Sequence, residues 1–375
     1  MNYQLNEKPL VSAIVPAFNA QQYIGATLES LIHQSYPHLE IIVADDGSTD
    51  HTVQIVKEWM KKDQRIRLWQ QPNSGTGAAR NLAIRHSRGS FIAPVDADDI
   101  CYPDKIAKLL ACLQKSRSQV GLAYSWYTII DQEGKLTGIS SFSEFEGAVF
   151  LDLFFSNFIG NASTSLIRKE CFDRAGLYNT WFFTQQAQGC EDYDMFLRIA
   201  EHFDFKVVRE CLTGYRKTGA SMSANFKVME KSRELVFKDQ KIRNPWIPDI
   251  VFDWAAAFYC LFLARKAAHK KSFAKAIKYF AKAAHYDPML LSNGEYLKLC
   301  IRSFVTPMMY IFENGSTTRY KKLPIGMISV EDLQRKMRTA KRSSLNAYKE
   351  RRRKAMHLLY SQAKLKAGDI VNSCV

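Results

Sequence analysis

The sequence predicts an α/β fold in which a doubly wound, mainly parallel sheet is followed by an α-helical C-terminal region. Three observations support this prediction. Short apolar runs alternate with segments of helical apolar spacing in the first half of the chain, several of these runs end in acidic or aromatic loops, and the chain becomes helical and basic from Asn225 onward. The length of 375 residues and the 47% hydrophobic composition allow more than one domain.

Apolar runs of strand length and helical segments alternate before residue 100. The runs are Leu10–Pro16, Leu39–Ala44, Ile66–Trp69 and Phe91–Val95. The helical segments are Ile24–Ser35, Thr52–Lys62 and Gly77–Ser87, and a helix over Pro103–Ser116 and a strand over Gly121–Ile130 are expected after them. This alternation predicts parallel strands whose carboxyl ends meet at one ligand-binding edge of the sheet.

The run Phe91–Val95 is followed by three carboxylates within four residues, those of Asp96, Asp98 and Asp99. Carboxylates this close repel each other unless a cation or several hydrogen-bond donors lie among them. Mg²⁺ and Mn²⁺ prefer such hard oxygen ligands, and Mg²⁺ usually binds one or two carboxylates together with substrate phosphates. The alternatives are a solvated acidic loop and a role for Asp99 as the cap of the helix near Pro103.

Polar or aromatic loops also follow the other predicted strands. Phe18 follows the first strand and Asp46 the second, with core packing and turn or cap chemistry as their respective alternatives. The glycine-containing segment Pro72–Asn81 opens a helix and can offer backbone N–H groups to an anion. Arg80 would lie in the first turn of that helix, where a cation is unfavourable, and this favours a ligand role for Arg80.

A second acidic pair, Glu191 and Asp192, begins a predicted helix with an apolar stripe. Acidic residues are favourable at the start of a helix, so simple capping is one interpretation of this pair.

Charge and cysteine content limit the classes of protein to consider. Residues 1–226 carry 22 Lys and Arg against 25 Asp and Glu, whereas residues 227–375 carry 30 against 12, so the basic part would face anions. The eight cysteines include no Cys-x-x-Cys pair, which favours a reducing compartment. The N-terminus lacks the apolar core of a signal peptide, and no apolar run approaches the roughly 20 residues of a membrane span. We therefore expect a cytoplasmic protein.

Four motifs occur in an order that resembles a known family. They are Val15–Asn19, Ala44–Asp50, Asn73–Gly75 with Ala79–Asn81, and Asp96–Asp99. Together they resemble the inverting glycosyltransferases of family 2, which have the GT-A fold, and the resemblance covers residues 10–225. It implies a nucleotide-sugar donor, usually a uridine diphosphate sugar, and a saccharide or lipid-linked acceptor.

The resemblance also implies roles for individual residues around the donor. Phe18 would lie against the base, Asp46 would hydrogen-bond its edge, and Arg80 would help to hold the nucleotide. Asp96 would contact the ribose and the sugar, and Asp98 would bind the Mn²⁺ or Mg²⁺ that bridges the diphosphate. Pro16 and Ala97 lie in the same motifs and are expected to contribute to donor binding.

The same resemblance extends to two later segments. Glu191 and Asp192 match the family's Glu-Asp motif, in which the residue at Asp192 is the general base, and inversion needs such a carboxylate to take the acceptor proton. Leu212–Ser223 is similar to the family's closing loop, with Arg216, Lys217 and Ser221 as candidate diphosphate contacts. Where the family often has histidine, this chain has Thr218, so the metal would be held by Asp98, the diphosphate and water.

The chain is expected to have three regions: residues 1–226 as the catalytic domain, 227–328 as a helical region, and 329–375 as a basic amphipathic helical tail. Phe273–Ala284 with Asp287-Pro288 resembles one tetratricopeptide-like hairpin. The basic tail, with Arg351–Lys354, would be either a solvated helix or a segment adsorbed on an anionic membrane at the inner face. No base-reading module is present, so no nucleic-acid partner is expected.

Two interpretations stay open at this stage. An aromatic stripe from Phe142 to Phe158 would be either core or an acceptor-binding face. The chain as a whole would be either a transferase or a degenerate module, or basic adaptor, that binds a nucleotide or glycan without turnover.

Overall fold

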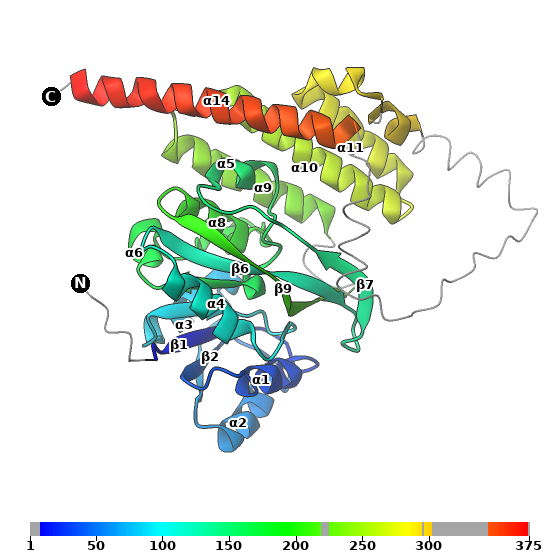
Figure 1. The fold of residues 1–375 in the computed structure, drawn as a ribbon. Coiled ribbons are helices and arrows are strands. Elements are labelled where there is room, and N and C mark those ends of the chain that lie inside the picture. Colours follow the sequence, from blue (N-terminus) through cyan, green and yellow to red (C-terminus); the bar gives the residue numbers. More distant parts are fainter. Residues whose placement is uncertain (1–7, 219–224, 295, 302–343, 374–375) are drawn as a thin grey trace, which may run out of the picture. The chain divides into compact units, whose positions relative to one another are not determined.

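The computed structural model describes residues 8–218, 225–294, 296–301 and 344–373. The chain forms two compact units, Met1–Leu153 with Asn157–Asp239 and Phe154–Ser156 with Gln240–Val375 (Figure 1). The boundaries predicted at residues 226 and 328 stay predictions.

The first unit is built on one mixed sheet. Its strands are β1 (Val11–Ala17), β2 (Leu39–Asp45), β3 (Ile66–Gln70), β4 (Phe91–Pro94), β5 (Ile100–Cys101), β6 (Val120–Ile130), β7 (Leu136–Ser141), β8 (Ser165–Arg168) and β9 (Asp204–Arg216). They lie in the order β3-β2-β1-β4-β8-β6-β9-β5, with β7 paired to β6. Strands β3, β2, β1 and β4 are parallel neighbours, as the alternating pattern predicts, whereas β8 pairs antiparallel with both β4 and β6.

The helices of this unit are α1 (Ile24–Ile32), α2 (Thr52–Lys62), α3 (Thr76–His86), α4 (Lys105–Lys115), α6 (Cys171–Ala175), α7 (Trp181–Thr184) and α8 (Glu191–Ala200), with a 3₁₀ turn at Ala162–Thr164. Helices α1 to α4 begin and end close to the predicted residues and α8 begins at the predicted Glu191, whereas α6 and α7 were not predicted. Two further helices, α5 (Phe150–Phe155) and α9 (Phe226–Arg243), run across the boundary between the two units in the sequence.

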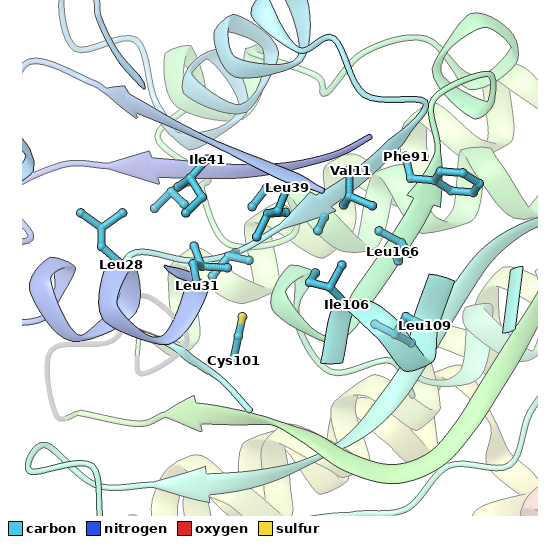
Figure 2. Packing of buried hydrophobic residues seen from close by; sticks show 14 of the residues in the cluster. Val11, Leu28, Leu31, Leu39, Ile41, Phe91, Cys101, Ile106, Leu109 and Leu166 are labelled. Carbon is cyan, nitrogen blue, oxygen red and sulfur yellow. The ribbon is translucent and has the colours of Figure 1, made fainter. Parts of the chain in front are cut away.

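Alternate residues of the parallel strands face one hydrophobic core. Val11 of β1 and Ile41 of β2 pack there with Leu28 of α1 and Ile106 of α4 (Figure 2). The residues between them face the other way, toward α3, which packs against β1 and β2. Burial on both faces explains why these strands are continuous apolar runs in the sequence.

The register of the parallel strands brings their carboxyl ends to one edge. Ala17 pairs with Asp45, and Ile14 pairs with Pro94, so the loops that follow β1, β2 and β4 start at a similar level. This edge is where the sequence predicts a ligand site.

The second unit is helical. It contains α10 (Asp249–His269), α11 (Phe273–Tyr286), a 3₁₀ turn at Pro288–Ser292, and α14 (Ser344–Ser373). Helices α10 and α11 pack against each other, as expected for a helical hairpin.

Part of the predicted basic tail is packed in this unit. Asp287 is 2% exposed and accepts hydrogen bonds from Tyr348 and from the Arg352 guanidinium, whose Nη2 lies 2.7 Å from Asp287 Oδ1. Met356 is fully buried on the same helix. Arg352 therefore forms an ion pair within this unit. Residues 329–343 of the predicted tail lie outside the described residues. Among the helices that the structure describes, none combines the length and the apolar character of a membrane span.

Candidate functional site

Asp46 follows β2 and organises the glycine-containing loop before α3. Its Oδ1 accepts hydrogen bonds from Gln71 Nε2 at 2.7 Å and Ser74 N at 2.9 Å, and Oδ2 accepts one from Gly75 N at 2.8 Å. The Asp46 side chain is buried. Its direct role is therefore to hold this loop, and its predicted hydrogen bond to a base stays a prediction.

Phe18 follows β1 and is 49% exposed, so the alternative of core packing is wrong for this residue. The loop behind the ring is fixed, because Asn19 N donates to Ser48 Oγ and Asn19 Oδ1 accepts from Thr49 N, both at 2.9 Å. Asn19 has a φ of +48°, in the left-handed region that Asn tolerates better than most residues. An exposed ring on a fixed loop is suited to stack on a planar ligand.

The acidic loop after β4 is a place where negative charge is costly. Asp96, Asp98 and Asp99 follow one another in a turn closed by a hydrogen bond from Asp99 N to Asp96 O at 3.1 Å. Burial and then the charge of Asp96 raise the pKa of Asp98 to about 6. Burial, followed by the charges of Asp98 and Asp96, raises the pKa of Asp99 as well.

Asp99 does not cap the helix near Pro103, and this alternative is wrong. Helix α4 begins at Lys105 with Asp104 at its N-cap position. Asp99 is instead fully buried, and its carboxylate accepts hydrogen bonds from Asn161 Nδ2 at 2.5 Å and Arg216 N at 2.9 Å. It joins the acidic loop to two segments that come much later in the chain.

Arg216 supports the acidic loop from the end of β9. Its Nε donates to Asp98 O at 2.7 Å, and its Nη1 donates to Asp131 O and Gln132 O at 2.8 Å each. The guanidinium carbon also lies 4.7 Å from the centre of the Tyr23 ring. These contacts make Arg216 a positioning residue for Asp98, and its predicted contact with a diphosphate stays a prediction.

Glu191 and Asp192 are the first two residues of α8 and are desolvated. Asp192 Oδ1 accepts a hydrogen bond from Tyr193 N, and Glu191 Oε2 accepts one from Gly189 N, both at 2.7 Å. Glu191 Oε1 is buried and has no hydrogen-bond partner among the described residues. Burial, followed by the charges of Asp96 and Glu191, raises the pKa of Asp192 to about 7. A carboxylate with this pKa is suited to accept a proton at neutral pH.

Arg80 connects the two acidic segments. Its Nη2 lies 2.6 Å from Asp96 Oδ1, and its side chain is 5% exposed. Burial opposes the charged form, but the carboxylates of Asp96, Asp192 and Glu191 raise the pKa of the guanidinium. The same guanidinium lowers the pKa of Asp192. The structure therefore brings the predicted pair on α8 into electrostatic range of the acidic loop.

A divalent cation at the acidic loop would have to be held largely by a bound diphosphate. Within the described ranges, no group of three His, Cys, Asp or Glu side chains could hold a metal ion by itself. Asp98 provides one hard oxygen ligand, and a cation there would relieve its repulsion with Asp96. This donor set suits Mn²⁺ or Mg²⁺ bound by Asp98, phosphate oxygens and water.

The remaining predicted site residues differ in their surroundings. Pro16 is buried within β1. Ala97 is buried, and its carbonyl accepts a hydrogen bond from Thr27 Oγ1 at 2.9 Å. Lys217 is exposed, with Nζ 5.1 Å from the centre of the Tyr215 ring. Ser221 lies outside the described residues.

A hollow of about 530 Å³ lies beside the loop that follows β1. Its lining residues are Asn19, Gln21, Gln22, Tyr23, Thr49, Asp50, Gln132 and Thr218. Thr218, the position where the family often has histidine, thus opens onto the same hollow as the loop of Asn19.

Sequence reasoning missed several residues that build the site. Ser163 Oγ accepts a hydrogen bond from Asp96 N at 2.9 Å, and Asn161 holds Asp99. Tyr178 lies under Arg80, with the guanidinium carbon 5.2 Å from the ring centre, and its backbone exchanges two hydrogen bonds of 2.8 Å with the Asn81 amide. The available signal was the run of small polar residues immediately before the apolar strand β8.

Comparisons with known proteins agree on one family. The family model described as Glycosyl transferase family 2 matches residues 12–174. The protein named "Putative teichuronic acid biosynthesis glycosyltransferase TuaG" of Bacillus subtilis (strain 168) is 31% identical over 236 residues, which cover 62% of this chain and 89% of that protein. Chondroitin synthase of Escherichia coli is 30% identical over 245 residues, and the match spans only 33% of its length.

Solved structures show the same fold. S. aureus TarS matches with a TM-score of 0.50 at 16% identity, over 84% of this chain and 57% of that chain. S. aureus TarS 1-349 in complex with UDP-GlcNAc matches with a TM-score of 0.50 at 18% identity, over 79% of this chain and 92% of that chain. The likeness confirms the predicted GT-A-type α/β fold followed by a helical region.

Proposed function

Because this chain belongs to glycosyl transferase family 2, we propose that it transfers one sugar from a uridine diphosphate sugar to a saccharide or lipid-linked acceptor. The transfer would invert the anomeric carbon and serve the synthesis of a surface polysaccharide or glycan. The observation that carries this proposal is the convergence of Asp96, Glu191 and Asp192 on the buried cation of Arg80.

In this proposal Asp192 is the general base. Its carboxylate, with a pKa of about 7, takes the proton of the acceptor hydroxyl as that oxygen attacks the anomeric carbon. The bond from that carbon to the diphosphate oxygen breaks at the same time, and the diphosphate leaves on the opposite face of the sugar. No nucleophilic side chain is needed for a single inverting displacement.

The donor side of the site would bind the leaving group. Phe18 offers an exposed ring for the base, and Asp98, held by Arg216 through its backbone carbonyl, offers one carboxylate oxygen to a divalent cation. When bound, Mn²⁺ or Mg²⁺ would neutralise the charge that develops on the diphosphate. Arg80 holds Asp96 in place beside this position.

A thermal-shift screen and a transfer assay test the proposal together. The screen measures the melting temperature with uridine, guanosine and thymidine diphosphate sugars, with and without Mn²⁺, because a ligand that binds the native state stabilises it. The assay measures nucleoside diphosphate release with a panel of p-nitrophenyl glycosides as acceptors. Asp98→Ala is expected to remove the Mn²⁺-dependent part of donor stabilisation, whereas Asp192→Asn should keep donor binding.

The competing function is a degenerate module that binds a nucleotide or glycan without turnover. Donor binding with no transfer and no donor hydrolysis across the whole panel would favour that module over the enzyme.

We also propose that the basic C-terminal region contacts an anionic membrane surface at the cytoplasmic face. Residues 227–375 carry 30 Lys and Arg against 12 Asp and Glu, and Arg351 and Lys354 are exposed on α14. The charge reversal Arg351→Glu with Lys354→Glu leaves the Arg352 and Met356 contacts in place. Flotation with phosphatidylglycerol vesicles should decrease in this variant, and unchanged flotation would exclude this part of α14 as the contact.

A further inference from the structure

We propose that the segment from Trp181 to Gln188, here called the acceptor platform, binds a sugar unit of the acceptor beside Asp192. This inference rests on the proposed transferase function and names the part of the chain that would recognise the acceptor. The acceptor platform was not among the site residues that the sequence predicts.

The acceptor platform lies against the loop that Asp46 holds. A Cβ atom added at Gly75 would lie 2.7 Å from Phe183 Cβ and 2.8 Å from Gln188 Nε2, and Gly75 N donates to Asp46 Oδ2. Only glycine, here with a φ of +91°, allows this close approach. The two segments are therefore in direct contact at the start of α3.

The acceptor platform also leads directly into the proposed base. Gly189 follows it with a φ of +131° and donates its N–H to Glu191 Oε2 at 2.7 Å. Asp192 is the next residue after Glu191. Only three residues of the chain thus separate the acceptor platform from the carboxylate that would take the acceptor proton, and one of them is held to Glu191.

The backbone of the acceptor platform is held in a defined turn. Gln185 N donates to Trp181 O at 2.9 Å, and Ala187 N donates to Phe182 O at 2.8 Å, while Gln186 has a φ of +49°. Lys231 Nζ donates to Gln185 O at 2.6 Å from α9. A non-glycine residue at positive φ is more often found where the fold holds a functional loop in place.

The surface chemistry of the acceptor platform matches a saccharide. Phe182 is buried and stacks on Trp181 with ring centres 4.0 Å apart, whereas Phe183 is 37% exposed. Thr184, Gln185 and Gln186 are exposed next to Phe183. An aromatic face can pack on the C–H groups of a sugar ring, and carboxamides and hydroxyls can exchange hydrogen bonds with its hydroxyls.

Three rings of the aromatic stripe that sequence reasoning offered as an acceptor-binding face belong to the core. Phe150, Phe154 and Phe158 are buried, with at most 8% exposure. These rings belong to the core, so the core interpretation of the stripe is confirmed for them.

Phe183→Ala tests the acceptor platform in the transfer assay. We expect the acceptor KM to rise about tenfold, as for the loss of one well-packed ring contact, while the donor KM and acceptor-free donor hydrolysis change less than about twofold. Phe183→Tyr retains the ring and should keep the acceptor KM of the original chain. Phe183→Leu removes the ring and should raise the acceptor KM. Phe262→Ala, which truncates a 55% exposed phenylalanine of the helical unit, is the matched control and should leave both KM values unchanged.

Two results would overturn the inference. One is an unchanged acceptor KM in Phe183→Ala. The other is a parallel loss of donor hydrolysis and donor affinity, which would assign Phe183 to donor binding or to folding.

Failure of the proposed function can be recognised separately. If the original chain shows neither transfer nor donor hydrolysis, saturation-transfer NMR with the same p-nitrophenyl glycosides measures saccharide binding directly. Binding that is lost in Phe183→Ala and kept in Phe262→Ala would support the acceptor platform without turnover, and no binding by the original chain would refute it.

Discussion

At the scale of single residues, the site is organised by the electrostatic balance around Arg80. The guanidinium is paired with Asp96 and lowers the pKa of Asp192, whereas burial, Asp96 and Glu191 raise that pKa. The outcome is a carboxylate that titrates at about pH 7 and not near its ordinary value of 3.8. A base with this pKa accepts a proton more readily than an ordinary aspartate does.

Asp192→Asn is expected to lower the transfer rate by about 10²- to 10⁴-fold, because an amide cannot accept the hydroxyl proton. The same change should raise the melting temperature at both pH values, by less at pH 5, where only the start of the titration window has been crossed, than at pH 8. The folded-state pKa is raised, so the folded protein is destabilised by the buried charge as the pH rises from about 4 through 7. Thermal melts at the two pH values, compared with steady-state rates, check both parts. Equal melting shifts at pH 5 and pH 8 would contradict the raised pKa.

Arg80→Gln should move the lower limb of the pH–rate profile to higher pH. Without the guanidinium, the remaining carboxylates repel the charged form of Asp192 and its pKa rises further. The measurement is kcat/KM against pH from 5 to 9. Arg85→Gln, which removes an exposed cation from the last turn of the same helix, is the control and should leave the profile in place. A profile that moves to lower pH in Arg80→Gln would show that Asp192 is not the titrating base.

At the scale of elements, the site depends on loops that hold one another. The loop after β1 is bonded to the loop after β2 through Asn19, and Asp99 joins the acidic loop to the end of β9. The start of α3 is covered by the turn around α7. Each loop follows a strand or begins a helix. The sheet register therefore fixes where the loop starts, and the contacts between loops fix the position of its outer residues.

Gly75→Ala tests the contact between α3 and α7. The change places a methyl group 2.7 Å from Phe183 Cβ at a φ of +91°, so we expect the free energy of unfolding to fall by about 2–4 kcal/mol. Gly138→Ala is the matched control, because Gly138 has a φ of +78° and no described residue lies within 4 Å of the added Cβ, and it should cost about 1 kcal/mol. Urea unfolding of both variants measures the difference. Equal losses would mean that backbone strain alone, and not the contact with α7, determines the requirement for glycine.

At the scale of the whole molecule, the excess of positive charge lies in a different part of the chain from the candidate site. The site lies in the first unit, and the Lys and Arg excess lies in the part of the chain from residue 227 onward. In the second unit the helix α14 is tied to the end of α11 by the buried carboxylate of Asp287. The cations of this helix therefore lie in two kinds of surroundings: Arg352 forms an ion pair within the unit, whereas Arg351 and Lys354 are exposed.

Arg352→Ala should destabilise the second unit by about 3 kcal/mol, because the buried Asp287 carboxylate would lose its cationic partner. The guanidinium carbon lies 4.5 Å from the centre of the Trp254 ring, so tryptophan fluorescence during urea unfolding can follow the change. Arg351→Ala is the control and should cost less than about 0.5 kcal/mol, as for an exposed side chain. Equal stability of the two variants would contradict the structural role of Arg352.

The sequence by itself determined the α/β class, the positions of the parallel strands and the loops that carry the candidate residues. The apolar run Leu39–Ala44 indicates a strand buried on both faces, and the apolar spacing within Thr52–Lys62 indicates a helix buried on one face. Both patterns can be recognised from neighbouring residues in the sequence. The motif order also led to family 2, which the comparisons confirm.

Only the tertiary structure decided how these residues act on one another. Asp96 and Asp192 are far apart in the chain, and their shared interaction with Arg80 depends on strand register and on the packing of α3 and α8. The burial that raises the pKa of Asp192, the hydrogen bonds that occupy Asp99 and Arg216, and the exposure of Phe183 are likewise set by neighbours distant in sequence. Such long-range contacts leave no periodic trace in the sequence, because each depends on the folded position of both partners.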